Sequence, residues 1–183
     1  MCGFIGYICD GNSKRIDEYR KKFDVYFEKQ KFRGPDYQEK IFLEKNNKTI
    51  KIGFNRLSIL DLSDKGNQIF KNEEFLLLFN GEILNFKILK DKYFKDIKFN
   101  SSTDTEVLFE FLMKFKMSKI NELEGMFAFI LIDLRNNKVI LCKDFTGIKP
   151  LYYHINNEGI FFSSDANFLY SLSNKQLNYY ACK

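Results

Sequence analysis

The sequence predicts an antiparallel α+β fold, and three features of its pattern support this prediction. Hydrophobic residues recur at helical spacing in three separate segments, extended segments come in pairs joined by short polar turns, and single strands do not alternate with single helices. The chain has 183 residues, of which 45% are hydrophobic, with 21 Phe and 10 Tyr. This is enough for one hydrophobic core and too little for two. We therefore expect one domain over residues 1–183.

The first predicted helix covers residues 16–30, where apolar side chains recur every three or four positions between charged ones. Ser13 lies just upstream and is available as its cap. The segment at 33–36, Arg-Gly-Pro-Asp, then breaks the pattern, because proline lacks a backbone donor and glycine frees the backbone. We expect a structured loop there.

Strands follow in the middle of the chain. Residues 40–44 and 49–54 flank a short Asn-Asn-Lys turn and predict a hairpin. Residues 75–79 form a continuous apolar run, which is typical of a buried strand. This strand is expected to end at Asn80 and Gly81.

The second half of the chain has helical patterns first and strand patterns afterwards. Helical spacing predicts helices over residues 86–93 and 107–115. Two hairpins follow, and their predicted strands cover residues 126–134, 138–142, 151–155 and 160–163. Residues 177–183 resemble the opening of another helix.

Charge and hydropathy argue against several classes of function. The net charge of +5 comes from Lys and Arg residues that are interleaved with Asp and Glu, so no basic patch for nucleic acid is predicted. The longest apolar run, residues 126–132, is too short to cross a bilayer. No basic segment precedes the apolar residues at 4–8, and Asp10 follows them, which is unlike a secretory signal. We expect a cytoplasmic protein with no nucleic-acid or membrane partner.

The cysteines predict neither a metal site nor a disulfide framework. Cys2, Cys9, Cys142 and Cys182 form no CxxC pair, and His154 is the only histidine that could complete a zinc site. Their sparse spacing is also unlike that of secreted disulfide-rich domains and fits a reducing compartment. No metal ligand is therefore assigned.

One of these cysteines has a distinctive position. Removal of Met1 would leave Cys2 at the N-terminus, and an initiator methionine is normally trimmed before a residue this small. An α-amino group has a pKa of about 7.7 to 8.0, so it can accept the proton of its own thiol near neutral pH. Cys2 would then supply both nucleophile and base. By itself, however, a cysteine at position 2 is more simply an ordinary core thiol.

Seven short motifs along almost the entire chain support the catalytic alternative. They are, in order, Cys2-Gly3-Phe4-Ile5-Gly6, Arg33-Gly34-Pro35-Asp36, Arg56-Leu57-Ser58-Ile59, Asn80-Gly81-Glu82-Ile83, Asp104-Thr105-Glu106-Val107, Glu124-Gly125-Met126-Phe127-Ala128-Phe129 and Gly147-Ile148-Lys149-Pro150-Leu151-Tyr152-Tyr153. Together they make the sequence resemble the N-terminal glutaminase domain of asparagine synthetases, a class II glutamine amidotransferase. The resemblance implies an N-terminal-nucleophile hydrolase fold, an αββα sandwich of two stacked antiparallel sheets flanked by helices. The RGPD, NGEI and DTEV forms favour asparagine synthetase over glucosamine-6-phosphate synthase and amidophosphoribosyltransferase.

The resemblance implies which residues perform the chemistry. Cys2 would be the nucleophile, and the Asn80 amide with the backbone N–H of Gly81 would form the oxyanion hole. An Asn-Gly pair between strands is also a common plain turn. Its place in the family order and the Glu82 that follows it weigh against that alternative.

The resemblance implies the substrate-binding residues in the same way. Arg56 would grip the α-carboxylate of glutamine, since a planar guanidinium can bind two oxygens at once. Glu82 and Asp104 would receive the α-ammonium group. The backbone of the next segment would lie beside the ligand, and it comprises Leu57, Ser58, Ile59 and Leu60. Purely structural roles stay open as well: a surface ion pair for Arg56, core positions for the apolar side chains, and a favourable charge in the first turn of a helix for Asp104.

The implied reaction is the hydrolysis of L-glutamine. The Cys2 thiolate attacks the side-chain amide, ammonia leaves, and water frees glutamate from a γ-glutamyl thioester. This half-reaction needs no cofactor. ATP and Mg²⁺ are expected only at a synthetase domain, whose Ser-Gly-Gly-x-Asp-Ser loop does not occur in these 183 residues. The expected partner is a synthetase domain or subunit that receives the ammonia, with aspartate as the default acceptor, and a homodimer stays open.

A module without catalysis is the alternative function. It would dock on a synthetase partner and regulate it, but it would have no need for the full set of site residues. Six positions depart from the family pattern and put loop closure, and its coupling to a second site, in question. They are Phe32, Phe54, Ile69, Leu84, Lys143 and Asp165.

Overall fold

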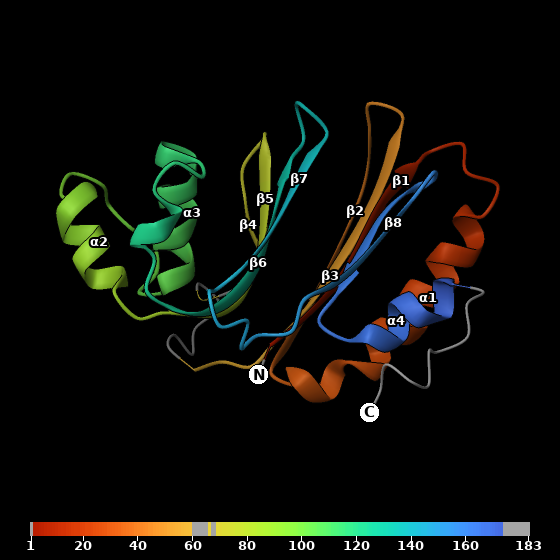
Figure 1. The fold of residues 1–183 in the computed structure, drawn as a ribbon, viewed down its shortest axis with the longest axis horizontal. Helices are drawn as coiled ribbons and strands as arrows, with labels where there is room; N and C mark the ends of the chain where they lie inside the picture. Colours follow the sequence, from red (N-terminus) through yellow and green to blue (C-terminus); the bar gives the residue numbers. More distant parts are fainter. Residues whose placement is uncertain (1, 60–65, 67–68, 174–183) are drawn as a thin grey trace.

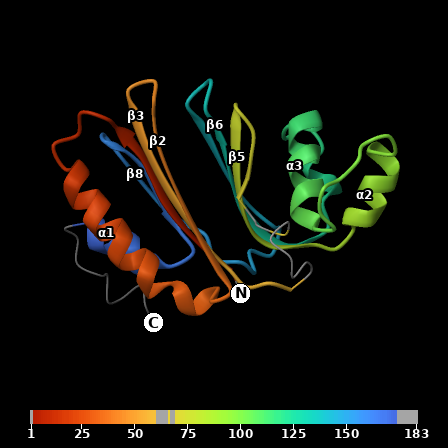
Figure 2. The same ribbon diagram turned by 180° about the vertical axis from the view of Figure 1, so that it is seen from behind.

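A computed structural model of the chain describes residues 2–59, 66 and 69–173. Two antiparallel sheets lie face to face, and helices cover the outer face of each, so the layers run helix, sheet, sheet, helix (Figures 1 and 2). Hydrophobic clusters fill all three spaces between these layers. The predicted α+β sandwich is confirmed.

The five-stranded sheet has the N-terminal strand at its centre. In order across the sheet, its strands are β2 (Tyr37–Lys45), β3 (Lys48–Arg56), β1 (Gly3–Asp10), β9 (Gly159–Ser163) and β8 (Tyr152–Asn156). Phe4 of β1 faces the other sheet and Tyr7 faces the helices, so both faces of this strand are buried. Asn46 and Asn47 have φ values of 52° and 59°, as a two-residue hairpin turn requires. The predicted β2–β3 hairpin is confirmed.

The four-stranded sheet consists, in order, of β4 (Ile69–Lys71), β5 (Phe75–Ile83), β6 (Gly125–Asp133) and β7 (Lys138–Lys143). The prediction that β5 ends at Asn80 and Gly81 is wrong, because both residues pair with β6 and the strand continues to Ile83. A Cβ atom at Gly81 would lie 2.3 Å from the Met126 carbonyl oxygen. The glycine therefore allows close approach of two strands and does not form a turn.

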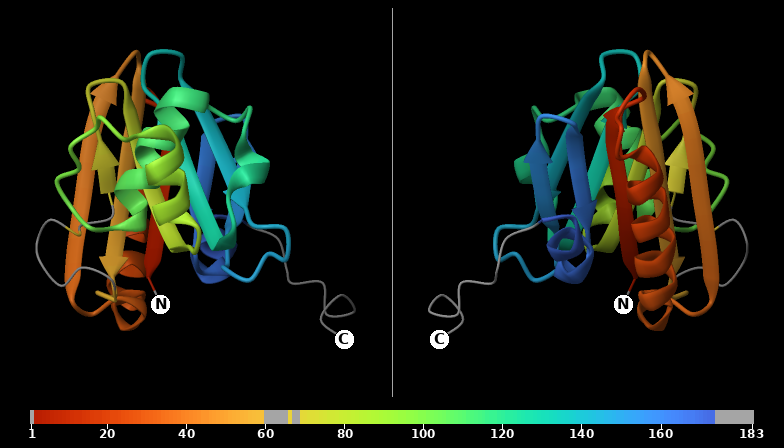
Figure 3. Two further views of the ribbon diagram at one scale, coloured as in Figure 1. Left: turned by 90° about the vertical axis from the view of Figure 1, so that its left-hand side faces the viewer. Right: turned by 90° about the vertical axis from the view of Figure 1, so that its right-hand side faces the viewer.

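Within residues 2–59, 66 and 69–173, helices cover the outer face of both sheets (Figure 3). They are α1 (Ile16–Lys29) and α4 (Ala166–Leu172) on the five-stranded sheet, and α2 (Phe86–Tyr93) and α3 (Asp104–Phe115) on the four-stranded sheet. Short 3₁₀ turns lie at Lys31–Arg33 and Ile120–Glu122. In the described part of the chain, no helix is both long and apolar enough to cross a membrane. The three helices predicted before residue 120 are confirmed, whereas α4 and β4 were not predicted, and residues 177–183 lie outside the described residues.

The helix caps differ from the prediction at α1. Arg15, not Ser13, occupies the N-cap position, and the Ser13 hydroxyl accepts a hydrogen bond from the Arg15 backbone (3.2 Å). At α3, Thr103 accepts from the backbone N–H of Glu106 (3.3 Å), and the Glu106 carboxylate accepts from the backbone N–H of Ser101 (2.7 Å). These bonds satisfy donors at the start of α3 and fix the position of its first residue.

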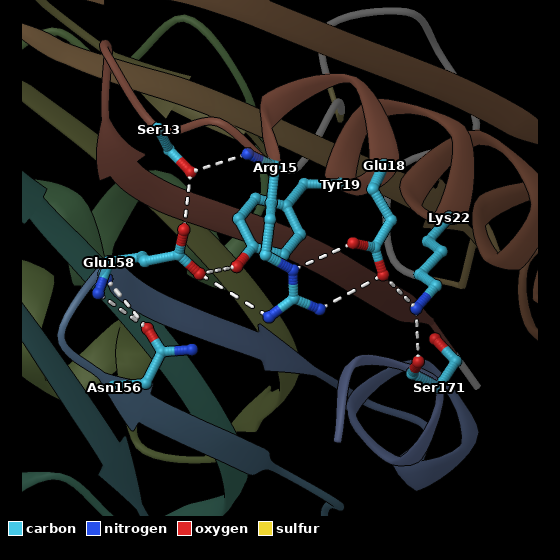
Figure 4. A network of polar contacts seen from close by, with 9 residues as sticks. Ser13, Arg15, Glu18, Tyr19, Lys22, Asn156, Glu158 and Ser171 are labelled. Carbon is cyan, nitrogen blue, oxygen red and sulfur yellow. Dashed lines mark hydrogen bonds and ion pairs between the residues drawn. The ribbon is translucent and has the colours of Figure 1, made fainter. Parts of the chain in front are cut away.

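Polar contacts fasten α1 to the β8–β9 turn and to α4 (Figure 4). Glu158 in that turn accepts hydrogen bonds from the hydroxyls of Tyr19 and Ser13. Lys22 donates to the Ser171 carbonyl of α4 at 2.5 Å. Because Tyr19 and Ser13 donate to its carboxylate, the pKa of Glu158 is lowered from its usual value. The network holds the helix layer on this sheet.

The two ends of the sandwich carry different kinds of segment. The sheets converge at the end where β1 begins and β3 and β5 end, and they diverge toward the hairpin turns at the opposite end (Figure 1). The turns at the divergent end, residues 46–47 and 135–137, are short and polar. The start of β1, the end of β3 and the end of β5 lie at the convergent end, and they carry the motif residues Gly3, Arg56 and Asn80 to Ile83.

Candidate active site

Cys2 lies at the start of β1 and faces the space between the two sheets. Its side chain is 6% exposed and belongs to the inter-sheet cluster that includes Phe4 and Phe54. The backbone N–H of Leu57 donates to Cys2 Sγ at 3.4 Å, and the Sγ donates to the Leu57 carbonyl at 3.6 Å. The thiol is therefore held against the segment that follows β3.

Burial and nearby positive groups act on this thiol in opposite directions. Burial raises the pKa of Cys2, and it is the largest effect. The Leu57 N–H, the amino terminus, Arg56 and Lys149 each lower that pKa, because they favour the thiolate. The pKa of Cys2 is raised overall, and these cationic and N–H groups oppose the effect of burial, which is the direction that a reactive cysteine needs.

Arg56 is the last residue of β3 and is only 4% exposed. Side chains alternate along a strand, and Ile52 and Phe54 face the other sheet, so Arg56 faces the same space as Cys2. Its effect on the Cys2 pKa shows that the two groups lie near each other. This burial does not fit a surface ion pair, and it leaves a guanidinium beside the thiol where a carboxylate could bind.

Residues 57–59, which we call the strap, continue from β3 past the thiol. Leu57 is partly buried and packs against the inter-sheet cluster. Ser58 donates its backbone N–H to Asp36 Oδ2 at 2.7 Å. Ile59 is exposed, so a core position suits Leu57 and not Ile59. Leu60, the fourth residue of the predicted segment, lies outside the described residues.

Asn80 is buried, and its amide donor bonds to none of the described residues. Because Leu76 and Leu78 of β5 face the inter-sheet cluster, the Asn80 side chain faces it too, and β5 contacts β1 across this space. Asn80 is 1% exposed, and its Nδ2 has no hydrogen-bond partner among the residues that the structure describes. Leaving a buried donor unpaired costs about 1–3 kcal/mol. This orphaned donor therefore indicates a site for a bound oxygen atom.

Two carboxylates lie where β5 ends and α3 begins. Asp104 is 2% exposed, and its Oδ2 accepts from the backbone N–H of Ile83 at 2.8 Å. The pKa of Asp104 is raised to about 6, mainly by burial and also by the negative charge of Glu82, against the lowering effect of hydrogen bonds from Ile83 and Thr105. Glu82 and Asp104 are therefore close enough for their charges to interact. Such a pair suits an ammonium group.

Arg33 is a further residue at the site, and the sequence reasoning gave it no role. Its Nε donates to the Cys2 carbonyl at 3.4 Å. A Cβ atom on Gly3 would lie 3.1 Å from Arg33 Cδ, so the glycine leaves room for this contact. The sequence signal that could have indicated a role for Arg33 is the occurrence of Cys2-Gly3 together with an arginine directly before Gly34.

The six departures from the family pattern fall into different environments. Phe54 and Ile69 are buried in the inter-sheet cluster, so both positions contribute to core packing. Phe32 and Leu84 are exposed, and Lys143 ends β7. Asp165 caps α4 by accepting from the backbone N–H of Asn167 (2.8 Å).

Comparisons with known proteins agree with this geometry. A family model described as a glutamine amidotransferase domain matches residues 1–182. Asparagine synthetase [glutamine-hydrolyzing] 1 of Bacillus subtilis is 31% identical over 167 residues, which is 90% of this chain and 26% of that protein. Asparagine synthetase [glutamine-hydrolyzing] 2 of Arabidopsis thaliana is 32% identical over 173 residues, which is 90% of this chain and 28% of that protein.

The fold has solved counterparts as well. A glutamine phosphoribosylpyrophosphate amidotransferase from Bacillus subtilis matches with a TM-score of 0.67 and 16% identity, over 92% of this chain and 43% of that one. This likeness shows the N-terminal-nucleophile hydrolase fold. The chain spans about a third or less of the length of the curated relatives it matches. It belongs to the glutamine amidotransferase domain family, and its relatives include glutamine-hydrolysing asparagine synthetases.

Proposed function

We propose that this domain hydrolyses L-glutamine to glutamate and ammonia through a thioester on Cys2. The observation that carries the proposal is the buried Nδ2 of Asn80, which has no hydrogen-bond partner in the described part of the chain and faces the same inter-sheet space as the Cys2 thiol. An amide donor of this kind suits the oxyanion that forms when a thiolate attacks a carbonyl. Family membership supports the same reaction.

The reaction begins after Met1 has been removed. The free amine of Cys2 takes the thiol proton, and the thiolate attacks the side-chain amide carbon of glutamine. Asn80 Nδ2 and the backbone N–H of Gly81 stabilise the oxyanion. The protonated amine gives its proton to the leaving nitrogen, so the C–N bond breaks, ammonia departs and a γ-glutamyl thioester remains. Water then breaks the C–S bond, which returns the thiol and releases glutamate.

The two charged groups on the α-carbon of glutamine are each held by side chains of opposite charge. Arg56 binds the α-carboxylate, and Glu82 and Asp104 bind the α-ammonium group. The backbone of the strap and of Leu60 lies beside the ligand. This arrangement favours glutamine over an amide that lacks either charge, because a buried charge without its partner is costly.

The ammonia serves a synthetase. We infer that a synthetase domain or subunit receives it in the cytoplasm and transfers it to aspartate, with ATP and Mg²⁺ bound at that second site and no cofactor at this one. The names of the relatives and their much greater length support this inference.

A glutaminase assay on processed protein tests the proposal. Mass spectrometry first establishes that Cys2 is N-terminal, and glutamate release is then measured for the wild type and for Cys2→Ala. We expect release from the wild type alone. Absence of release from the processed wild type would leave a docking and regulatory module as the function.

A further inference from the structure

The strap depends on contacts beyond the sheet for its position. The pairing of β3 with β1 reaches Asn55, opposite Gly3, and its pairing with β2 reaches Arg56, opposite Tyr37. The strap begins at the next residue, and its first member, Leu57, bonds to Cys2 Sγ through both its N–H and its carbonyl. Whatever holds the strap therefore also sets the hydrogen bond to the sulfur.

Asp36 bonds to the chain on both sides of Leu57. Its Oδ2 accepts from the backbone N–H of Ser58 at 2.7 Å, and its own backbone N–H donates to the Arg56 carbonyl at 3.1 Å. The first of these bonds is charge-assisted and short, which makes it stronger than an ordinary hydrogen bond. Asp36 itself is exposed, so packing is not the reason for its position.

The segment that carries Asp36 is itself rigid. A Cβ atom at Gly34 would lie 2.2 Å from the Asn55 carbonyl oxygen, so this glycine rests directly on the backbone of β3. Pro35 restricts φ just before Asp36. Arg33, at the start of the same segment, bonds to the Cys2 carbonyl. A rigid segment anchored on β3 and on Cys2 therefore presents the carboxylate to Ser58.

We propose that Asp36 is a positioning residue for the nucleophile: its carboxylate holds the strap so that the Leu57 N–H stays on Cys2 Sγ. This inference rests on the proposed function, in which Cys2 is the nucleophile. Asp36 takes no part in bond making, and its effect on the thiol passes through Leu57.

Loss of the Asp36 carboxylate should make the thiol harder to ionise. The groups that lower the pKa of Cys2 include the Leu57 N–H, Arg56 from β3 and Lys149 from the β7–β8 loop. Substitution at position 36 leaves the two charged side chains in place and loosens only the N–H donor. The thiolate fraction near neutral pH should then fall, and the reactivity of the thiol should fall with it.

The test compares Asp36→Ala, Asp36→Asn and a matched control, Asp133→Ala, in the processed chain. Asp133 also accepts from backbone N–H groups, those of Arg135 (2.9 Å) and Asn136 (3.0 Å), but it does so at the opposite end of the sandwich. Iodoacetamide labelling of the N-terminal peptide is followed by mass spectrometry across pH, and kcat/KM is measured for glutamine.

We expect Asp36→Ala to shift the labelling profile to higher pH and to lower kcat/KM by about tenfold or more, the size expected for a lost hydrogen bond to a charged group. Asp36→Asn keeps an acceptor oxygen and should restore most of both, and Asp133→Ala should match the wild type in both. An unshifted profile in Asp36→Ala overturns the inference, as does an Asn variant as impaired as the Ala variant. Failure of Asp36→Ala to fold overturns it too, since the side chain would then stabilise the whole domain.

The labelling profile separates this inference from the proposed function. It requires no turnover, so it still shows whether Asp36 acts on the thiol if the wild type releases no glutamate. In that case the proposed function fails, and the profile alone decides the positioning role.

Discussion

Replacing Asn80 by Ala should separate catalysis from stability. In the free protein the Asn80 amide is buried and its Nδ2 has no partner among the described residues, so its removal recovers about 1–3 kcal/mol of desolvation cost. That gain offsets the packing lost with a small side chain, and the free energy of unfolding should stay within about 1 kcal/mol of the wild type. Loss of an oxyanion donor costs about 2.7–4 kcal/mol in the transition state, which lowers kcat by about 10²–10³.

Asn85 supplies the matched control for this substitution. Both ends of its amide are bonded, because Nδ2 donates to the Glu122 carbonyl (2.8 Å) and Oδ1 accepts from the backbone N–H of Glu124 (3.1 Å). Asn85→Ala should therefore lower stability by about 1–3 kcal/mol, since it removes both bonds to partly buried backbone groups. It should reduce kcat far less than Asn80→Ala does.

Two measurements decide the outcome. Urea denaturation gives the free energy of unfolding of each variant, and glutamate release at saturating glutamine gives kcat. If Asn80→Ala keeps its turnover and loses several kcal/mol of stability, the amide is a structural group and the oxyanion assignment is wrong. Equal losses of kcat in the two variants would also contradict the reasoning.

Single contacts support three further predictions. The pKa of Asp104 is raised to about 6, and a neutral carboxyl cannot attract an ammonium group. KM for glutamine should therefore rise as pH falls below about 6 and stay level above it. A KM that is independent of pH between about 5 and 8 would exclude Asp104 from binding. Gly81→Ala places a Cβ 2.3 Å from the Met126 carbonyl oxygen and should cost about 1–3 kcal/mol of stability, measured in a thermal melt. An unchanged melting temperature would show that β5 and β6 can separate locally. Glu158→Gln should lower stability by about 1 kcal/mol near neutral pH, since it weakens the acceptor for Tyr19. The pKa of Glu158 is lowered in the folded state, so the stability difference between wild type and variant should be present above the pKa of Glu158 in the unfolded chain. It should vanish as pH falls through the pKa of Glu158 in the folded protein. A stability difference that persists in acid would point to lost packing instead.

Local pattern was a sufficient guide to most of the fold. The helix that starts at Ile16 and the hairpin around Asn46 and Asn47 were predicted because spacing and turn chemistry are encoded over a few adjacent residues. β4 is three residues long and α4 is seven, which is too short for periodicity to show. The end of β5 was misplaced for another reason, because an Asn-Gly pair resembles a turn unless its partner strand is known.

The candidate site was likewise predictable from the sequence only in part. The motifs supplied the chemically capable residues, including Cys2, Arg56 and Asn80, and the resemblance supplied their roles. Arg33 and Asp36 belonged to a quoted motif and still received no role, because their partners, the Cys2 carbonyl and the Ser58 N–H, lie far away in the sequence. A contact between distant segments leaves no periodic signal in either one.

The sequence alone determined which groups are present, which segments are helix or strand, and to which family the chain belongs, since these depend on residue identity and local spacing. Only the tertiary structure decided that Cys2, Arg56 and Asn80 face one space, that Asn80 keeps an unused donor there among the described residues, and that Leu57 bonds to the thiol. The physical reason is the stacking of two sheets. Strand register fixes which face each side chain takes, and the packing of one sheet on the other then determines which of those faces meet.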